Sequence, residues 1–263
     1  MSKDKRLTLY AAVDSPFAHR VHLALEEAGA VYDLIWIDLI DKEEWFEKKV
    51  NPAGGKVPLL VYGGPKLHPA DAPSGDAVKL IESVVILEFL ADLFPAARLL
   101  PEDPVLRARA RFFSAAIESK LLKAFMGFRF LGEPIEGLLA VLDEFQGMLP
   151  PTGFVVGEWS IADAAFSPLL ARFLLLLSTG LGNFPRETGR EGLEAFESPR
   201  FARLRRYYED VMARPSMLQT WDEVTEKWAA EQEAVKATTV RRMDRFRKTG
   251  IINSFMRLPV PAT

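Results

Sequence analysis

The spacing of apolar residues divides the chain into a first part, where strand and helix signals alternate, and a longer second part. Short β-branched and aromatic runs predict strands at residues 7–13, 31–37, 57–62 and 78–81. Apolar residues recur at helical spacing over residues 17–28, where Gly29 ends the pattern, and again from residue 84 onward. A short helix is also predicted at residues 42–49. This alternation indicates a compact α/β unit.

Beyond Pro95 only helical periodicity is found. Helices are predicted at residues 104–130, 133–148, 161–179, 199–213 and 217–248. Residues 97–103 contain Pro101 and form a predicted linker. The fold class is therefore an α/β domain at residues 1–96 followed by an all-α domain at residues 104–263.

Charge and hydropathy narrow the range of partners. The 263 residues include 33 Lys and Arg against 36 Asp and Glu, so no strong field attracts nucleic acid or an anionic membrane. The most apolar stretch, residues 169–181, contains Arg172 and is too short to span a bilayer. The charged start of the chain does not resemble a signal peptide. We expect a cytoplasmic protein with no nucleic-acid or membrane partner.

The chain contains no cysteine. This excludes disulfides, cysteine-ligated metal sites and any mechanism with a protein thiol as nucleophile. No metal site is predicted, and the absence of cysteine is compatible with a reducing compartment.

Three short segments carry groups that could bind or activate a small polar ligand. Ser15 stands at the start of the first helix, where a hydroxyl either caps the helix or stabilises an anion at the positive helix end. Val57-Pro58 opens a strand, and a cis bond there would leave the Val57 backbone able to pair with an extended peptide. Glu82-Ser83 joins a strand to a helix. Ser83 either caps that helix or, with Glu82, receives an amino-acid head group.

The order and spacing of these segments resemble the glutathione site of the glutathione transferases. The resemblance is carried by Ser-Pro-Phe-Ala at 15–18, Asn-Pro-Ala-Gly at 51–54 ahead of Val57-Pro58, and Glu82-Ser83. The Pro-Phe-Ala triplet and the run Asp-Lys-Glu-Glu-Trp-Phe at 41–46 are similar to the omega class in particular. The resemblance covers most of the chain. It implies a thioredoxin-like N-terminal domain, an all-helical C-terminal domain with a structural capping box at Ser160 and Asp163, and a homodimer.

The resemblance also implies roles for individual residues. Ser15 would face the glutathione sulfur, Val57 would pair its backbone with the cysteinyl part of glutathione, and Pro58 would be cis. Glu82 and Ser83 would hold the γ-glutamyl group. The other expected glutathione-binding residues are Phe17, Lys42 and Lys56, the two lysines neutralising the glycyl carboxylate.

Omega enzymes usually carry cysteine where this chain has Ser15, so the sequence resembles a serine-type variant. A charge-assisted bond from a hydroxyl contributes about 1.5–3 kcal/mol, roughly one to two pKa units, and the helix terminus adds about 0.3–1 kcal/mol. Bound glutathione would then be substantially thiolate at neutral pH and could attack an electrophile or a peroxide. Thiol-transferase activity is not expected, because a mixed disulfide needs a protein thiol. A donating hydroxyl needs no base, so we expect His19 to be structural.

Three functions are compatible with these residues. The first is a glutathione transferase that uses glutathione as co-substrate against small hydrophobic electrophiles or peroxides, as in detoxification. The second is a weakly catalytic or non-catalytic protein that sequesters hydrophobic or aromatic ligands beside glutathione. The third is a structural or regulatory protein without turnover, against which the intact Ser15, Glu82 and Ser83 argue. One or two phenylalanines of helix 104–130 would line the site of the second ligand.

Overall fold

The computed structural model describes residues 5–39, 42–51 and 54–221. Along the chain its elements are β1 (Leu7–Ala11), α1 (Pro16–Glu27), β2 (Tyr32–Trp36), η1 (Phe46–Val50), β3 (Leu59–Tyr62), β4 (Val78–Leu80), α2 (Ser83–Leu93), η2 (Pro95–Ala97), α3 (Pro104–Ala116), η3 (Ile117–Leu121), α4 (Leu122–Met126), η4 (Gly127–Leu131), α5 (Ile135–Met148), α6 (Ile161–Thr179), α7 (Arg186–Glu197), η5 (Pro199–Phe201) and α8 (Ala202–Met212). The helix predicted at residues 217–248 lies almost entirely outside the described residues, although residues 215–221 are helical.

The four strands form one mixed sheet in the order β2-β1-β3-β4. β1 runs parallel to β2 and antiparallel to β3, with Tyr10 opposite Leu59. β4 runs antiparallel to β3, with Leu80 opposite Leu60. The end of β1, the start of β3 and the end of β4 therefore lie at the same end of the sheet. Each of the three predicted ligand segments follows or precedes one of these strand ends.

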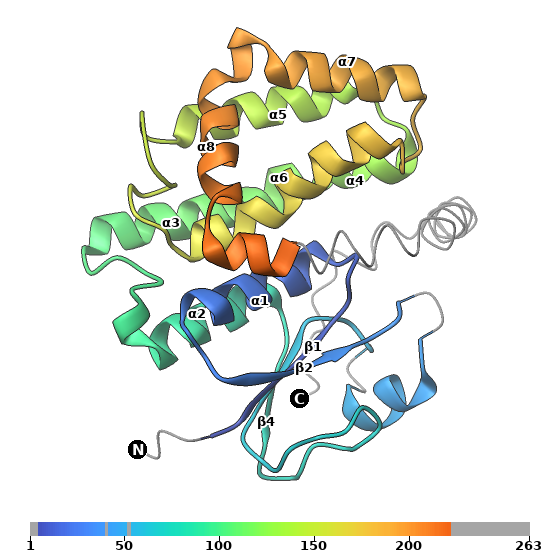
Figure 1. The fold of residues 1–263 in the computed structure, drawn as a ribbon, viewed down its shortest axis with the longest axis vertical. Coiled ribbons are helices and arrows are strands. Elements are labelled where there is room, and N and C mark those ends of the chain that lie inside the picture. Colours follow the sequence, from blue (N-terminus) through green and yellow to red (C-terminus); the bar gives the residue numbers. More distant parts are fainter. Residues whose placement is uncertain (1–4, 40–41, 52–53, 222–263) are drawn as a thin grey trace.

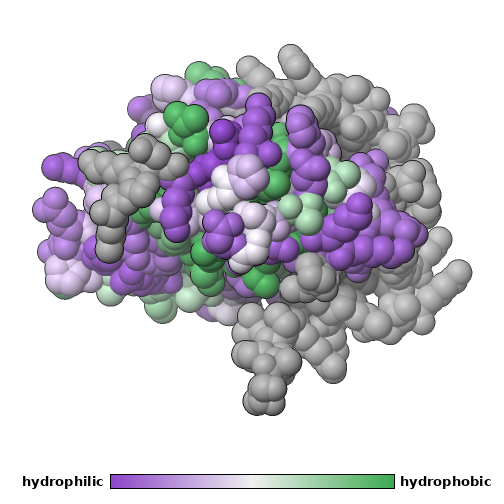
Figure 2. Space-filling view, turned by 90° about the horizontal axis from the view of Figure 1, so that it is seen from below, coloured by the Kyte–Doolittle hydropathy of each residue, from purple (hydrophilic) through white to green (hydrophobic). Residues whose placement is uncertain are grey.

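The two faces of the sheet are covered differently. On one face α1 and α2 pack between the sheet and the helical part of the chain, and their apolar residues form one continuous core with it (Figure 1). On the other face a smaller core gathers around Tyr10, Phe46 and Leu67, from β1, η1 and the loop between β3 and β4. Seen from below, described residues of mostly hydrophilic character surround scattered apolar ones (Figure 2).

The helical part is built around an aromatic core. Phe113 of α3 packs edge-on against Phe145 of α5 and Phe166 of α6, with ring centroids 5.0 and 5.3 Å away. α6 is long and apolar enough to cross a membrane by length and composition, yet 83% of its apolar window is buried inside the molecule. Of the phenylalanines considered for a second-ligand site, Phe112 is 68% exposed, whereas the buried ones are Phe113, Phe125, Phe128 and Phe130.

Helix α7 was not predicted from the sequence. Its buried face contains glycines, which give no hydrophobic signal. A Cβ on Gly189 would stand 2.6 Å from the Leu177 carbonyl oxygen, and one on Gly192 would stand 2.5 Å from Ile135 Cδ1. Glycine thus lets α7 lie close against α5 and α6, although Phe196 on the same buried face gives the sequence an apolar pattern that the prediction overlooked.

The architecture confirms the predicted fold class. A thioredoxin-like α/β sheet unit is followed by an all-helical part, with α3 beginning at Pro104 as expected. The short helix expected at residues 42–49 is present at residues 44–50, where η1 forms its longer part. The domain limits at residues 1–96 and 104–263 stay a prediction.

Candidate functional site

Ser15 is the N-cap of α1. Its hydroxyl accepts a hydrogen bond from the Ala18 backbone N–H at 3.2 Å, and Pro16 occupies the first helical position. The side chain is buried, with 6% of the residue exposed. Capping uses only an acceptor site of the hydroxyl, so its hydrogen is still available for donation. The capping and anion-binding interpretations of Ser15 are therefore compatible, and this geometry supports both.

The segment before β3 lies next to the end of β1. The Val57-Pro58 peptide bond is cis, as the resemblance implied. Buried Asn51 fixes the turn by donating from Nδ2 to the Lys56 carbonyl at 2.9 Å. Pro58 is buried and Val57 is half-buried, whereas Lys56 is exposed. The strand register places Val57 at the end of the sheet from which the chain passes to Ser15.

Glu82 and Ser83 lie at that same end, where β4 passes into α2. Glu82 has φ +66° and ψ 108°, a conformation that a non-glycine residue rarely adopts and that costs on the order of 1–3 kcal/mol. Such strain is concentrated at functional sites. Glu82 is exposed, whereas Ser83 is buried at the first position of α2.

The remaining predicted residues flank this end of the sheet. Phe17 is half-buried in the first turn of α1, and the Arg20 guanidinium lies 5.1 Å from its ring centroid. Lys42 is half-buried beside the turn that leads to Lys56, since its Nζ lies 3.2 Å from where a Cβ on Gly55 would stand. The fold thus gathers the predicted segments around the start of α1, while the ligand contacts of each residue stay predictions.

Sequence reasoning did not single out Arg20, whose side chain is wholly buried. It donates to the Ser83 hydroxyl at 3.1 Å, to Glu118 Oε1 at 2.6 Å and to the Ala165 carbonyl at 2.9 Å. Burial lowers the pKa of Arg20, and the Glu118 carboxylate opposes that shift. Because Ser83 accepts from Arg20, its own hydrogen is directed elsewhere. The sequence did offer a signal for Arg20. It stands three positions after Phe17 and four before Ala24, which places a charged residue on the apolar face of the helix.

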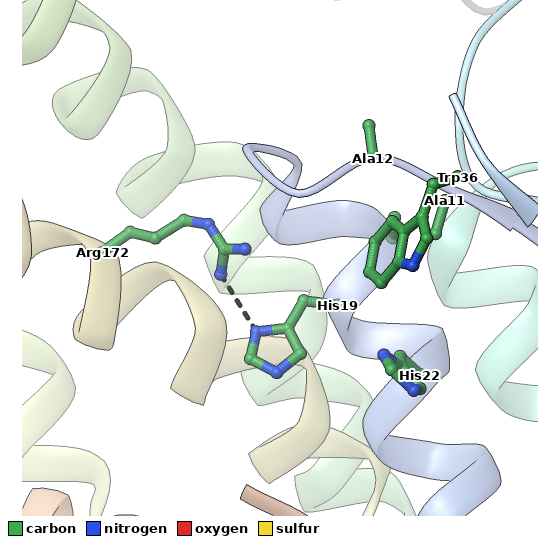
Figure 3. A pocket seen from close by; sticks show the side chains of 7 residues that line it. Ala11, Ala12, His19, His22, Trp36 and Arg172 are labelled. Carbon is green, nitrogen blue, oxygen red and sulfur yellow. Dashed lines mark hydrogen bonds between the residues drawn. The ribbon is translucent and has the colours of Figure 1, made fainter. Parts of the chain in front are cut away.

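His19 is a structural residue, as expected. Its Nε2 lies 2.8 Å from Thr220 Oγ1 and its Nδ1 lies 3.0 Å from a terminal nitrogen of Arg172, so both ring nitrogens are engaged. Burial, and next the Arg172 charge, hold the pKa of His19 well below its usual value. A cavity of about 10 Å³ lies between His19, Arg172 and Trp36 (Figure 3). That volume suits about one water molecule, not a substrate.

This end of the sheet is chemically suited to an anion. The first turn of α1 carries no acidic residue, and the carboxylate directly before the cap, Asp14, lies close enough to act on the charge of Arg172. A hydroxyl that can donate stands at the same place. Among residues 5–39, 42–51 and 54–221 there is no group of three or more His, Asp or Glu side chains placed to hold a metal ion.

Residues 14–93 match the family model of the glutathione S-transferase N-terminal domain. A protein of Nicotiana tabacum described as a probable glutathione S-transferase is 30% identical over 232 residues, which cover 85% of this chain and 93% of that protein. The chain belongs to the glutathione S-transferase family. The matched model includes the predicted glutathione-binding segments from Ser15 to Ser83.

Solved structures narrow the likeness to the omega class. Glutathione transferase Omega 2S from Trametes versicolor is 45% identical with a TM-score of 0.79, covering 89% of this chain and 97% of that one. The same protein in complex with 2,4-dihydroxybenzophenone gives 46% identity and a TM-score of 0.81, covering 87% and 99%. Omega 1C from the same organism is 42% identical, with a TM-score of 0.81 and coverage of 88% and 98%. The omega-like resemblance is confirmed, in a chain that contains no cysteine.

Proposed function

We propose that this family member binds glutathione at the shared end of β1, β3 and β4 and holds its sulfur as a thiolate on Ser15. The observation that carries this proposal is the start of α1: a buried hydroxyl caps the helix, keeps a hydrogen to donate and has no acidic side chain in the first turn. Helix ends of this kind favour negative charge. The thiolate then attacks a small hydrophobic electrophile or a peroxide in a reducing, cytoplasmic setting.

The remaining contacts in the proposal follow the sequence prediction. Val57, ahead of cis Pro58, pairs its backbone with the cysteinyl part of glutathione, and Phe17 borders the site. Glu82 and Ser83 hold the γ-glutamyl group. Lys42, whose Nζ approaches Gly55, and the exposed Lys56 neutralise the glycyl carboxylate. Ser83 suits a carboxylate because Arg20 occupies an acceptor site of its hydroxyl.

The experiment exploits the absence of cysteine, which makes any introduced thiol unique. Ser15→Cys places a thiol at a helix N-terminus, where thiol pKa values fall, close to the proposed position of the glutathione sulfur. After exposure to oxidised glutathione at pH 6.5, mass spectrometry should show a rapid adduct on this variant. Ser178→Cys is the matched control, because Ser178 is exposed near the end of α6. Equal adduct rates in the two variants, with glutathione binding intact, would show that Ser15 does not face the sulfur.

A second function is favoured by one comparison. Omega 2S from Trametes versicolor, 46% identical to this chain, has been solved with 2,4-dihydroxybenzophenone. We therefore propose, as the alternative, a protein that sequesters aromatic molecules beside the glutathione site with little turnover. Turnover of an aromatic electrophile, measured beside displacement of a fluorescent aromatic ligand, separates the two functions. Tight ligand binding without detectable turnover would favour the alternative.

We also propose a homodimer formed through α2 and α3. Val85 of α2 is 56% exposed and Phe112 of α3 is 68% exposed. A two-point bond from Arg111 to Glu88, at 2.9 and 2.7 Å, joins the two helices. Light scattering should give a dimer that Phe112→Glu dissociates. The control is Val31→Glu, since Val31 is 93% exposed at the start of β2.

A further inference from the structure

Arg172 connects the helical part of the molecule to the turn that precedes Ser15. It lies within α6, the most buried helix, and its side chain is itself wholly buried. One terminal nitrogen donates to the Val13 carbonyl at 2.8 Å. The other donates to His19 Nδ1 at 3.0 Å, as Figure 3 shows. The guanidinium also lies 5.5 Å from the centroid of the Trp221 ring. A single cation thus holds the end of the β1–α1 turn and the first turn of α1 together.

The hydrogen-bond chain beyond Arg172 fixes the orientation of His19. The Thr220 hydroxyl donates to the Ser216 carbonyl at 2.8 Å, so it must accept from His19 Nε2. His19 Nδ1 therefore carries no hydrogen and accepts from Arg172. This arrangement requires a neutral imidazole, in keeping with the lowered pKa of His19. His19 is a rigid link between α1, α6 and the segment 216–221.

Arg172 also brings a positive charge close to the start of α1 through its bond to the Val13 carbonyl. Burial lowers its pKa to about 9, with Asp14 opposing and Arg129 adding to the shift, so the guanidinium stays charged at neutral pH. The Val13 carbonyl lies two residues before Ser15, which by chain geometry puts the charge within about 10 Å of the Ser15 Cα. Besides Asp14 and Arg129, the titratable groups that face this cluster are His19 and His22.

A purely structural role explains this residue poorly. A buried charge is costly, and a well-packed apolar side chain of similar volume is often as stabilising or more so. What an apolar side chain cannot provide is the pair of directed bonds to Val13 and His19, or the positive charge. Both act on the turn that presents Ser15.

We propose that Arg172 is a positioning residue for Ser15, acting from the helical part through the Val13 carbonyl and His19. The proposal rests on the proposed function, in which Ser15 faces the glutathione sulfur. Arg172 does not touch the proposed glutathione contacts at Val57, Glu82 and Ser83, which lie on other elements. Its removal should therefore disturb reaction of the bound thiol more than binding of glutathione.

The test compares Arg172→Met and Arg172→Lys with the wild-type protein. Calorimetry gives the glutathione Kd, steady-state kinetics with an aromatic electrophile give kcat and KM, and thiolate absorbance gives the titration of bound glutathione. For Arg172→Met we expect kcat to fall about 10-fold or more, Kd to stay within about twofold, and the thiol pKa to rise by roughly half to one unit. Arg172→Lys keeps the charge but not both bonds, so kcat should fall about threefold with the thiol titration unchanged.

Arg203→Met is the matched control. Arg203, on α8, also holds two backbone carbonyls, those of Pro150 and Gly153, each at 2.6 Å, but both of these carbonyls lie in the helical part. This variant should lose stability without any change in thiol titration. If Arg172 only stabilises the fold, Arg172→Met should behave like Arg203→Met and lose stability with an unchanged thiol titration. Alternatively, kcat, glutathione affinity and the unfolding midpoint should all fall together.

The outcomes separate this proposal from the function on which it rests. A wild-type protein that binds glutathione without forming thiolate would overturn both. A wild type with thiolate, combined with unchanged kcat and titration in Arg172→Met, would overturn only the role of Arg172. If Arg172→Met does not fold, Arg172→Lys decides. An unchanged kcat in that variant contradicts the positioning role, and a threefold loss at constant Kd supports it.

Discussion

Helices α1 and α6 both begin at a serine N-cap, yet the two starts are built differently. The Ser15 hydroxyl accepts from the Ala18 N–H, and the Ser160 hydroxyl accepts from the Ala162 N–H. At α6 the Ser160 hydroxyl also donates to the Asp163 carboxylate at 3.0 Å, so the protein supplies its own anion there. At α1 the first turn has no acidic residue. The comparison teaches that a capped helix start is structural when a side chain closes it and can serve a ligand when none does.

The closed start is also the more deeply buried one. Ser160 and Asp163 are fully buried, and the carboxylate accepts further bonds from the Val155 N–H, the Ser160 N–H and the Tyr207 hydroxyl. Burial raises the pKa of Asp163 to about 6 in spite of these bonds. The four donors that bond to Asp163 are engaged by its carboxylate and are not available to a ligand. This helix start organises the helical core.

The largest expected effect is a loss of stability when the Asp163 carboxylate at the start of α6 is removed. Asp163→Ala leaves four buried donors without their acceptor, and each unsatisfied group costs about 1–3 kcal/mol. We expect the free energy of unfolding in urea to fall by about 3 kcal/mol or more. Ser15→Ala, which removes only a cap, should cost about 0.5–2 kcal/mol. Equal losses for the two variants would contradict the distinction between a closed and an open helix start.

In the second prediction the measured quantity is reactivity, and the larger effect is expected at the start of α1 instead of the start of α6. Ser15→Ala removes the hydroxyl proposed to donate to the thiolate, so the pKa of bound glutathione should rise by about one to two units. The conjugation rate at pH 6.5 should fall about 10-fold or more. Ser160→Ala is the matched control, because it removes a capping serine hydroxyl at the closed start. A thiol titration that shifts equally in both variants would remove the functional meaning of the comparison.

A smaller effect is expected at the start of α2, which lacks a side-chain capping bond. Glu82→Ala removes the proposed partner of the glutamyl ammonium group and should weaken glutathione binding several-fold in calorimetry. Glu88→Ala serves as control, because Glu88 lies on the same helix but binds Arg111. Unchanged affinity in Glu82→Ala would refute the assignment of the γ-glutamyl contact.

The smallest expected effect is the contribution of His19 to the pH dependence of stability. The pKa of His19 in the folded protein lies below its unfolded value near 6.5, so its contribution is present above that pH. As the pH falls, the unfolded chain takes up the proton first, so this contribution to the free energy of unfolding is lost. The loss is at most about 1.4 kcal/mol per pH unit. His19→Gln should show a flatter decline in unfolding free energy between pH 7.5 and 5.5. His68→Gln, in the exposed loop between β3 and β4, should keep the wild-type slope.

Local patterns could predict most of this fold, because each strand and most helices leave a periodic trace in the sequence. Helix α7 was overlooked, because two of its buried residues are glycines and Phe196 is the one large apolar side chain buried on that face. The places of Ser15, Val57 and Glu82 next to strand ends could be predicted, while their ligand contacts stay predictions. Arg20 and Arg172 were missed because their partners are remote: Ser83 lies 63 residues after Arg20, and His19 lies 153 residues before Arg172. No local pattern reports such a pairing.

The remote partners of α1 have a consequence for how the chain matures during synthesis. His19 hydrogen-bonds Thr220, which lies 201 residues later in the chain. Arg20 donates to the Ala165 carbonyl, 145 residues later, and Glu27 accepts from Arg214, 187 residues later. Until those later residues have left the ribosome, the first helix holds a histidine, a guanidinium and a carboxylate without these neighbours. Loop closure on this scale delays docking of the helix. The contacts that hold α1 against the helical part can therefore form only after residues as late as Thr220 have been synthesised.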